Sequence, residues 1–253
     1  MLKKVYKTYG EYAEKWAERK RGGDAGSHEY LEKPAMMAAL GDVSGKTILC
    51  VGCATGEECR MLKDMGAKRV VGVDKEYELI QVAKRAYPDL EFDTMPMEAL
   101  NFPEETFDMV YSSLVMHYAP EWSGPLAEVK KVLKKEGLFL FSTHHPIWWG
   151  AQSVREGDKF ITRLGAAKWG NNKNEIYGDY LTARKIENTM FNELVVTYYH
   201  KPLSDILEEI LSSGLRLKRF IEPKPTEEAK TKKFNFWAIH QKIPLFMIFE
   251  LQK

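Results

Sequence analysis

Apolar stretches of strand length that alternate with helical stretches constrain this chain more than any other feature. Thr47–Val51 is a continuous apolar run, and Val70–Asp74 is a second one that ends in an acid. Between the two runs, a helical stretch carries apolar residues three positions apart and ends at Gly66. Strands that are apolar throughout are buried on both faces, which is typical of a parallel sheet covered by helices.

The same alternation continues along the chain. Further helices are expected at Gly10–Arg21, Glu29–Leu40, Leu79–Ala86, Leu126–Leu133 and Leu203–Leu211, and further strands at Phe107–Ser112, Gly137–Ser142, Leu215–Ile221 and Pro244–Leu251. Right-handed crossovers between parallel strands bring their C-terminal ends to one edge of the sheet, and ligands bind at that edge. Side chains just after each strand are therefore the first candidates for a functional site.

The length of 253 residues allows one large domain or two small ones, at roughly 150 residues per domain. We expect a single domain over 1–253. Its parts are an N-terminal helical cover (1–44), a cofactor-binding core (45–145), an inserted lid (146–200) and a C-terminal completion of the sheet (201–253). The lid is expected to be antiparallel and to carry no core of its own, because it has few large aliphatic residues.

Composition excludes several classes of protein. With 37 Lys and Arg against 36 Asp and Glu, the net charge of +1 does not favour general binding to nucleic acid or to an acidic membrane. The three cysteines, Cys50, Cys53 and Cys59, are too close together for the disulfide framework of a secreted fold. No signal peptide or membrane span is evident, so a cytoplasmic location is expected. The oligomeric state stays open.

The strongest local motif is the turn Gly52–Gly56, which lies between the first apolar strand and a helix. Small residues there let the backbone approach a ligand closely, and the following helix offers unpaired N–H groups. Asp74, at the end of the next strand, can accept two hydrogen bonds from a ribose diol. Together these features predict a cofactor that contains a nucleoside.

Charge and spacing select among such cofactors. A dinucleotide fingerprint would place its third glycine at position 57, where this chain has Glu57 followed by Glu58. Two carboxylates at a helix N-terminus suit the helix dipole but would repel a pyrophosphate. A cofactor with adenosine, no phosphate and a positive sulfonium fits this turn better, and S-adenosylmethionine is such a cofactor.

At this point the chain resembles the class I, seven-stranded methyltransferases that use S-adenosylmethionine. The resemblance rests on Leu49–Gly56, Val71–Asp74, Glu98–Asp108, Ser112–Leu114 and Val132–Gly137, and it covers about residues 45–145. It implies an α/β fold, a three-layer Rossmann-like sandwich with a mostly parallel seven-stranded sheet. The blocks His200–Asp205 and Ile221–Pro223 look like the branch of the family that acts on small molecules.

The resemblance also implies roles for single residues. Around the cofactor it places Gly52, Cys53 and Gly56 at the methionine part, Asp74 with Lys75 at the ribose, Met97 and Glu98 at the adenine, and Ser112 with Ser113 beneath. Tyr6, Tyr9 and Trp16 of the N-terminal segment could cover the cofactor, although aromatic residues on an amphipathic helix are more often part of a core.

Three positions depart from the family pattern. Cys50 stands where an acid is usual, Ala54 where glycine is usual, and Pro96 where aspartate is usual. Ala54 adds only a methyl group. Cys50 removes a charge that helps to orient the amino-acid tail of the cofactor, and Pro96 removes an acceptor for the adenine amine. We therefore expect weaker cofactor binding than the family pattern would give.

Histidines supply candidate general bases. His117 follows one predicted strand and His145, beside His144, follows another, so both lie at the predicted ligand edge. His200 comes after the lid, and each of these histidines could instead serve only to hold a loop. Aromatic residues of the lid, Trp148, Trp149, Trp169, Tyr177 and Tyr199, form either a wall around an acceptor or a packed lid. No metal site is predicted, because Cys50, Cys53 and the nearby Cys59 have no fourth His or Cys ligand close by in the residues that follow.

The sequence thus predicts transfer of the sulfonium methyl group to a small-molecule acceptor by in-line displacement. One rival is a non-catalytic subunit that kept the fold, motivated by Cys50 and Pro96. The other is a methyltransferase for RNA or protein. Lys230, Lys232 and Lys233 beside aromatic residues could contact RNA, but neighbouring acids favour a solvated loop. No nucleic-acid partner is expected.

Overall fold

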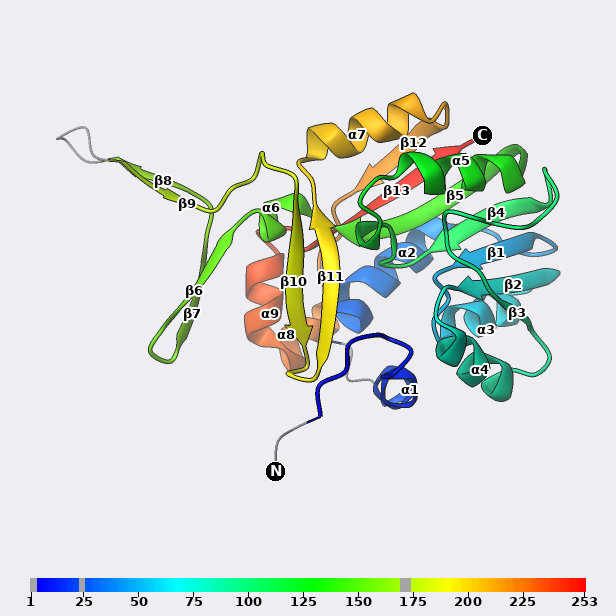
Figure 1. Cartoon of the computed structure of the whole chain (residues 1–253), viewed down its shortest axis with the longest axis horizontal. Helices are drawn as coiled ribbons and strands as arrows, with labels where there is room; N and C mark the ends of the chain where they lie inside the picture. The colour runs from blue at the N-terminus through cyan, green and yellow to red at the C-terminus, as the bar shows by residue number, and fades with distance from the viewer. Residues whose placement is uncertain (1–3, 23–25, 169–173) are drawn as a thin grey trace.

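A seven-stranded sheet forms the centre of the computed structural model, which describes residues 4–22, 26–168 and 174–253 (Figure 1). The strand order is β12-β13-β5-β4-β1-β2-β3. The strands are β1 (Thr47–Val51), β2 (Arg69–Asp74), β3 (Glu91–Thr94), β4 (Phe107–Ser112), β5 (Leu133–His144), β12 (Arg216–Ile221) and β13 (Phe246–Gln252). Strands β1 to β5 pair in parallel, and β13 pairs antiparallel with both β5 and β12. The predicted mostly parallel, Rossmann-like sheet is confirmed.

Helices cover both faces of this sheet. One face packs on α2 (Lys33–Leu40), α3 (Glu57–Asp64) and α4 (Tyr77–Ala86), and the other on α5 (Ser123–Val132) and α7 (Leu203–Ser212). Further helices are α1 (Ala13–Arg21), α6 (Pro146–Trp149), α8 (Glu227–Lys232) and α9 (Phe234–His240). A π-helical turn, His28–Glu32, leads into α2, and a 3₁₀ turn, Met116–Tyr118, follows β4. Within the described ranges, none of the helices is both long and apolar enough to cross a membrane.

Alternation along β1 shows how the layers form. Leu49 and Val51 pack on one side with residues of α5 and α7, such as Leu126 and Ile210. The alternate residues, including Cys50, pack on the other side with α2, α3 and α4. Because successive side chains of a strand point to opposite faces, one apolar run serves two cores. Burying each aliphatic side chain contributes about 1.5–3 kcal/mol to the stability of the fold. The two cores therefore hold the strands, and the loops at their C-terminal ends, in fixed positions.

The region 146–200 is built from antiparallel hairpins, as its alternating pattern predicts. The strands are β6 (Gln152–Glu156), β7 (Lys159–Arg163), β8 (Gly165–Lys168), β9 (Asn174–Tyr177), β10 (Arg184–Met190) and β11 (Leu194–His200), paired in sequence order. The first two hairpins project away from the sheet, whereas β10 and β11 lie against its edge (Figure 1). Trp169 of the predicted aromatic wall lies outside the described residues.

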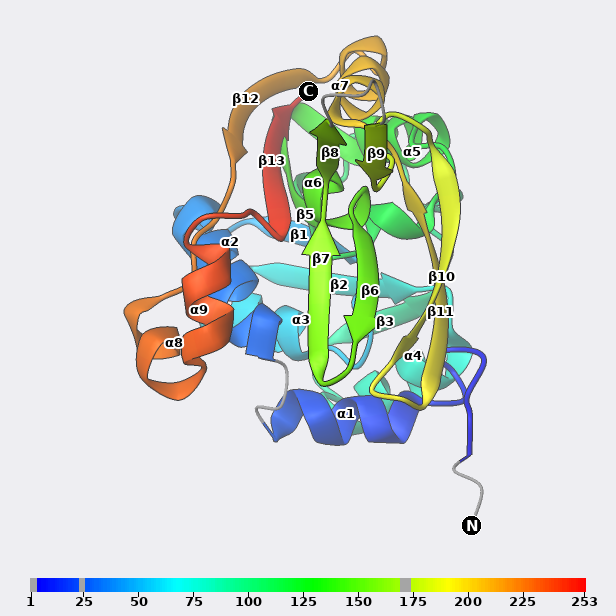
Figure 2. The same cartoon turned by 90° about the vertical axis from the view of Figure 1, so that its left-hand side faces the viewer.

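The N-terminal segment holds this last hairpin in place. Tyr6 bridges Leu194 of β11: its N–H donates to the Glu193 carbonyl over 2.7 Å, and its own carbonyl accepts from Val195 over 2.9 Å. Tyr6, Tyr12 and Leu194 are buried together in a small separate core. The segment therefore joins α1 to the strands that border the sheet edge (Figure 2).

Two expectations need correction. The stretch that contains Lys230, Lys232 and Lys233 was expected to be a solvated loop, but it lies in and just after helix α8, and Lys232 pairs with Glu228 one turn away at 2.6 Å. Thr226, which precedes α8, donates to the Tyr30 carbonyl, so these helices pack near the π-helical turn, away from β10 and β11 (Figure 2). The second correction concerns β3, which had no predicted counterpart.

Candidate cofactor site and acceptor pocket

The turn after β1 adopts the backbone that a close ligand approach requires. Gly52 and Gly56 have φ of +69° and +90°, in the left-handed region that favours glycine. Gly52 and Cys53 both donate their N–H to the Val73 carbonyl, which ties the turn to the end of β2. A Cβ built on Gly52 would lie 2.8 Å from Val115 Cγ1 and nearer still to Cγ2. Only glycine fits this position.

Asp74 is held at the sheet edge by two backbone N–H groups. Its Oδ2 accepts from Ala54 and its Oδ1 from Glu76, both over 3.0 Å. Burial raises the pKa of Asp74, and the two N–H donors oppose that rise. Each carboxylate oxygen keeps a second lone pair, so both can still accept a ribose hydroxyl. The residues present therefore fit the nucleoside part of S-adenosylmethionine.

The two carboxylates at the start of α3 are paired rather than free. Glu57 accepts from the Thr55 hydroxyl over 2.6 Å and lies 3.2 Å from Arg21. Glu58 is buried and lies 2.9 Å from Lys20. Although burial favours its protonated form, Lys20 and His28 lower the pKa of Glu58. The acids thus occupy the helix N-terminus where a pyrophosphate would bind.

The other predicted cofactor residues lie in different environments. Ser112 donates its hydroxyl to the Val51 carbonyl, and Ser113 donates to Glu32 over 2.8 Å. Cys53 is buried, Met97 is half-buried against the core, and Lys75 and Glu98 are exposed. The geometry contradicts none of these roles and tests none of them, so they stay predictions.

The N-terminal segment reaches the same edge. Gly10 donates its N–H to Glu76 over 3.2 Å, and the Tyr9 hydroxyl lies 2.6 Å from that of Tyr118. Burial raises the pKa of Tyr9 to about 12, and the nearby Asp74 charge adds to this effect. Trp16 meets Tyr9 edge to face at 5.2 Å. These contacts place the segment over the loop that follows β2.

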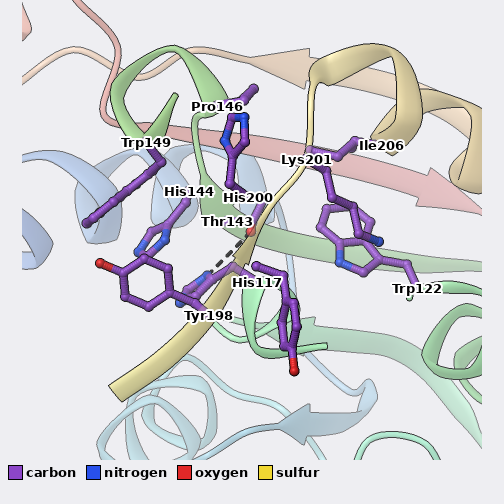
Figure 3. Close-up of a pocket in the computed structure, with 11 residues that line it drawn as sticks. His117, Trp122, Thr143, His144, Pro146, Trp149, Tyr198, His200, Lys201 and Ile206 are labelled. Carbon is purple, nitrogen blue, oxygen red and sulfur yellow. Dashed lines mark hydrogen bonds between the residues drawn. The ribbon is translucent and has the colours of Figure 1, made fainter. Parts of the chain in front are cut away.

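A small pocket lies between the ends of β4 and β5 and strand β11 (Figure 3). Its volume is about 10 Å³, which is about the room that one water molecule needs. It is lined by His117, Trp122, Thr143, His144, Pro146, Trp149, Tyr198, Tyr199, His200, Lys201 and Ile206. Of the predicted lid aromatics, Trp149 and Tyr199 therefore face this pocket.

Three aromatic rings form a stack along one wall. His117 and His144 lie 3.6 Å apart between ring centroids, and Trp149 continues the stack 4.4 Å from His144. Tyr198 meets all three rings nearly edge-on (Figure 3). Burial lowers the pKa of His117 to about 3, and burial together with His117 lowers that of His144 well below its usual range. Both imidazoles are therefore neutral near pH 7.

The two predicted bases have different environments. The Nδ1 of His117 lies 3.4 Å from the Thr143 hydroxyl, and the ring lines the pocket. His145 instead caps α6: its Nδ1 accepts from the Ile147 N–H, so its Nε2 donates to Glu222 over 2.8 Å. Both nitrogens of His145 are engaged, and it does not line the pocket. This geometry favours His117 over His145, although neither role is tested.

His200 is a further pocket residue with a defined tautomer. Its Nε2 donates to the Tyr180 carbonyl over 2.9 Å, which leaves Nδ1 unprotonated in the neutral ring. That Nδ1 is buried and has no hydrogen-bond partner among the described residues. His200 is the first residue of the block His200–Asp205, which resembles the small-molecule branch of the family, and it directly follows the lid, so two features of the sequence indicate it.

The buried histidines predict a pH dependence of stability. In the unfolded chain His117 binds a proton near pH 6.5, but in the folded chain it does so only near pH 3. The unfolded state thus binds more protons between these values, so the free energy of unfolding falls as pH drops from 6.5 toward 3 and is fully retained above 6.5. Each such histidine contributes up to about 1.4 kcal/mol per pH unit.

Urea unfolding between pH 7.5 and 4.5 checks this expectation. His117→Gln, which cannot titrate, should reduce the slope of stability against pH by about one proton relative to the native chain. An unchanged slope would show that His117 is already protonated or accessible in the folded state.

The three cysteines lie in the protein core, and their arrangement does not provide a metal site among the described residues. Cys50, Cys53 and Cys59 are all buried and free. Hydrogen bonds from Cys50 and Cys53 lower the pKa of Cys59 to about 6. Within residues 4–22, 26–168 and 174–253, no group of three or more His, Cys, Asp or Glu residues is arranged to hold a metal ion.

Known proteins share both the domain and the fold. Residues 49–141 match a family model described as a methyltransferase domain. A solved S-adenosylmethionine dependent methyltransferase from Mesorhizobium loti is 25% identical with a TM-score of 0.69, over 87% of this chain and 96% of that one. A further structure from Listeria monocytogenes, also described as a putative methyltransferase of this kind, gives the same TM-score at 23% identity, over 88% of this chain and 96% of that one.

Curated relatives match over varying lengths. An uncharacterized protein of Haemophilus influenzae is 25% identical over 78% of this chain and 77% of that protein. The trans-aconitate 2-methyltransferase of Azoarcus is 27% identical over 67% of this chain and 68% of that protein. Matches to three other curated methyltransferases span less than half of those proteins. By this domain, this sheet and these structural neighbours, residues 49–141 are a methyltransferase domain, and the chain has the class I fold of S-adenosylmethionine-dependent methyltransferases.

Proposed function

We propose that the chain transfers the methyl group of S-adenosylmethionine to a small-molecule acceptor at the pocket beside His117. Because the pocket has room for about one water molecule, the side chains that line it must move apart when the acceptor binds. One observation carries this proposal. The pocket lies between the ends of β4 and β5, and Val115, two residues before His117, packs against Gly52 of the cofactor turn. An acceptor there would lie next to the methionine part of a cofactor bound at Gly52 and Asp74.

The walls of the pocket suit a small acceptor. Aromatic rings supply apolar surface, while Thr143, His200 and Lys201 supply polar groups. Lys201 is 8% exposed and pairs with Glu209, so its charge is balanced within the protein. The Azoarcus relative that matches 67% of this chain is a trans-aconitate 2-methyltransferase, and this supports a small-molecule acceptor.

The chemistry requires little covalent participation by the protein. When the cofactor is bound, an electron pair of the acceptor forms a bond to the methyl carbon while the carbon–sulfur electrons return to sulfur. The residues of the chain then align the two reactants and exclude water, which supplies most of the rate. Neutral His117 or His200 can take the acceptor's proton if it must leave. Strand β11 forms one wall of the pocket through Tyr198, Tyr199 and His200.

Methyl-labelled S-adenosylmethionine and a panel of small acids, phenols and amines test the proposal. We expect labelled product with at least one acceptor. If the acceptor must lose a proton, His117→Gln should lower kcat by roughly 10²- to 10⁴-fold, whereas the matched variant His145→Gln should leave it within a few-fold. Cofactor binding without transfer to any acceptor would favour the non-catalytic rival, and salt-dependent binding of RNA would favour the nucleic-acid one.

A further inference from the structure

Glu32 is a fully buried carboxylate that the roles described above do not use. It ends the π-helical turn His28–Glu32, and its side chain is 0% exposed. One oxygen, Oε1, accepts hydrogen bonds from the hydroxyls of Ser113 and Ser142. Ser113 directly follows β4, and Ser142 lies near the end of β5. Two hydroxyls therefore fix this carboxylate at the functional edge of the sheet.

The other oxygen of Glu32 is left without a hydrogen bond. Oε2 is buried and has no hydrogen-bond partner among the described residues, and it lies 3.4 Å from Nε2 of His28. The Nδ1 of His28 is likewise buried without a partner. A buried polar atom with no partner costs about 1–3 kcal/mol, and more when it is charged. A buried polar atom that stays unpaired at this cost is a candidate for a functional role.

Glu32 and Glu58 have one lysine and one histidine as basic neighbours, and Nε2 of this histidine, His28, lies 3.4 Å from Glu32 and 3.1 Å from Glu58. Lys20 is the ammonium of this cluster, and it lies 2.9 Å from Glu58 and 3.1 Å from His28. Two carboxylates, Glu32 and Glu58, thus share one lysine. Burial raises the pKa of Glu32, while His28 and the two serine hydroxyls oppose the rise. A bound cation would stabilise the ionised form of this buried group.

The cluster lies beside the cofactor turn. Val115, two residues after Ser113, packs against Gly52, and Glu58 lies in the first turn of α3, which starts after Gly56. The family resemblance implies an acid where this chain has Cys50, whose side chain packs in the core between the sheet and α3. The chain thus lacks an acid at position 50 but brings one to the same edge from position 32.

We propose that Glu32 binds the ammonium group of the amino-acid tail of S-adenosylmethionine, so that it replaces the acid missing at position 50. This rests on the proposed cofactor site at Gly52 and Asp74. Glu32 is then a residue that positions the cofactor, clamped by Ser113 and Ser142. The ammonium would pair with Oε2, the oxygen that has no hydrogen-bond partner among the described residues.

Calorimetry with two ligands tests this assignment. S-adenosylhomocysteine carries the amino-acid tail, whereas 5′-methylthioadenosine has the same adenosine and sulfur without it. We expect Glu32→Gln to lower the affinity for S-adenosylhomocysteine roughly 10- to 100-fold and to change the affinity for methylthioadenosine less than twofold. The control is Glu29→Gln, which lies in the same π-helical turn and pairs with Lys33 nearer the surface; it should leave both affinities unchanged.

Other outcomes overturn the assignment. An equal loss for both ligands would show that Glu32 only supports the fold, and no loss would show that it does not meet the tail. If the native chain binds neither ligand, the cofactor site itself is wrong and the role of Glu32 fails with it. Should Glu32→Gln not fold, Ser113→Ala keeps the carboxylate but loosens its clamp. That variant should show a smaller loss that is again selective for the ligand with the tail.

Discussion

Replacing Asp74 by Asn is expected to lower the affinity for S-adenosylhomocysteine by roughly 10- to 100-fold, because hydrogen bonds to a charged group contribute about 1.5–3 kcal/mol. The carboxylate already accepts from Ala54 and Glu76, one N–H on each oxygen. Asn has only one acceptor oxygen, so it cannot both hold this loop and receive two ribose hydroxyls. Isothermal titration calorimetry gives the change directly.

Asp93→Asn is the matched control for this variant. Asp93 lies on the neighbouring strand β3, opposite Val73, and its exposed carboxylate accepts a hydrogen bond from the adjacent Thr94 N–H. It should bind S-adenosylhomocysteine like the native chain. If the Asp74 variant and the native chain bound S-adenosylhomocysteine with equal affinity, Asp74 would not contact the cofactor.

The second large effect is expected at Gly52. Gly52→Ala places a Cβ against Val115 at a φ of +69°. The left-handed backbone costs an L-residue about 1–2 kcal/mol, and overpacking adds about 1–3 kcal/mol. We expect the free energy of unfolding to fall by about 2–5 kcal/mol and cofactor binding to be lost, because the turn must move to relieve the contact.

Gly41→Ala separates the two causes. Gly41 also has a φ of +69°, but a Cβ there would meet nothing within 4 Å. For Gly41→Ala the free energy of unfolding should fall only by the backbone contribution of about 1–2 kcal/mol, and the affinity for the cofactor should not change. Urea unfolding and calorimetry on both variants measure the difference. Equal losses would mean that the contact with Val115 does not constrain the turn.

Local patterns explain why much of the sheet is visible in the sequence. The predicted strand Thr47–Val51 agrees with β1 because an apolar run that is buried on both faces is a local signal. The edge strand β3 carries no such signal, since only Phe92 of its four residues is buried. The last strand, predicted at Pro244–Leu251, corresponds to β13, which is almost continuously buried because it lies between β12 and β5.

The sequence likewise indicates some residues of the candidate site and not others. Gly52 and Asp74 belong to a compact motif with a fixed spacing, so the sequence indicates them directly. The stack that joins His117 to His144 and Tyr198 depends on β11 reaching the sheet edge, which no local pattern encodes. Glu32 meets Ser113 and Ser142 across 81 and 110 residues. Its neighbours in the sequence show only an amphipathic helix, so its burial could not be foreseen.

The central claim is that one sheet edge holds both the cofactor and the acceptor. A crystal structure of the native chain with S-adenosylhomocysteine at millimolar concentration tests it most directly. The account predicts the ribose on Asp74, the amino-acid tail between Gly52 and Glu32, and the sulfur facing the pocket lined by His117 and Thr143. Absence of the ligand from this edge, or a sulfur that faces away from His117, would contradict it.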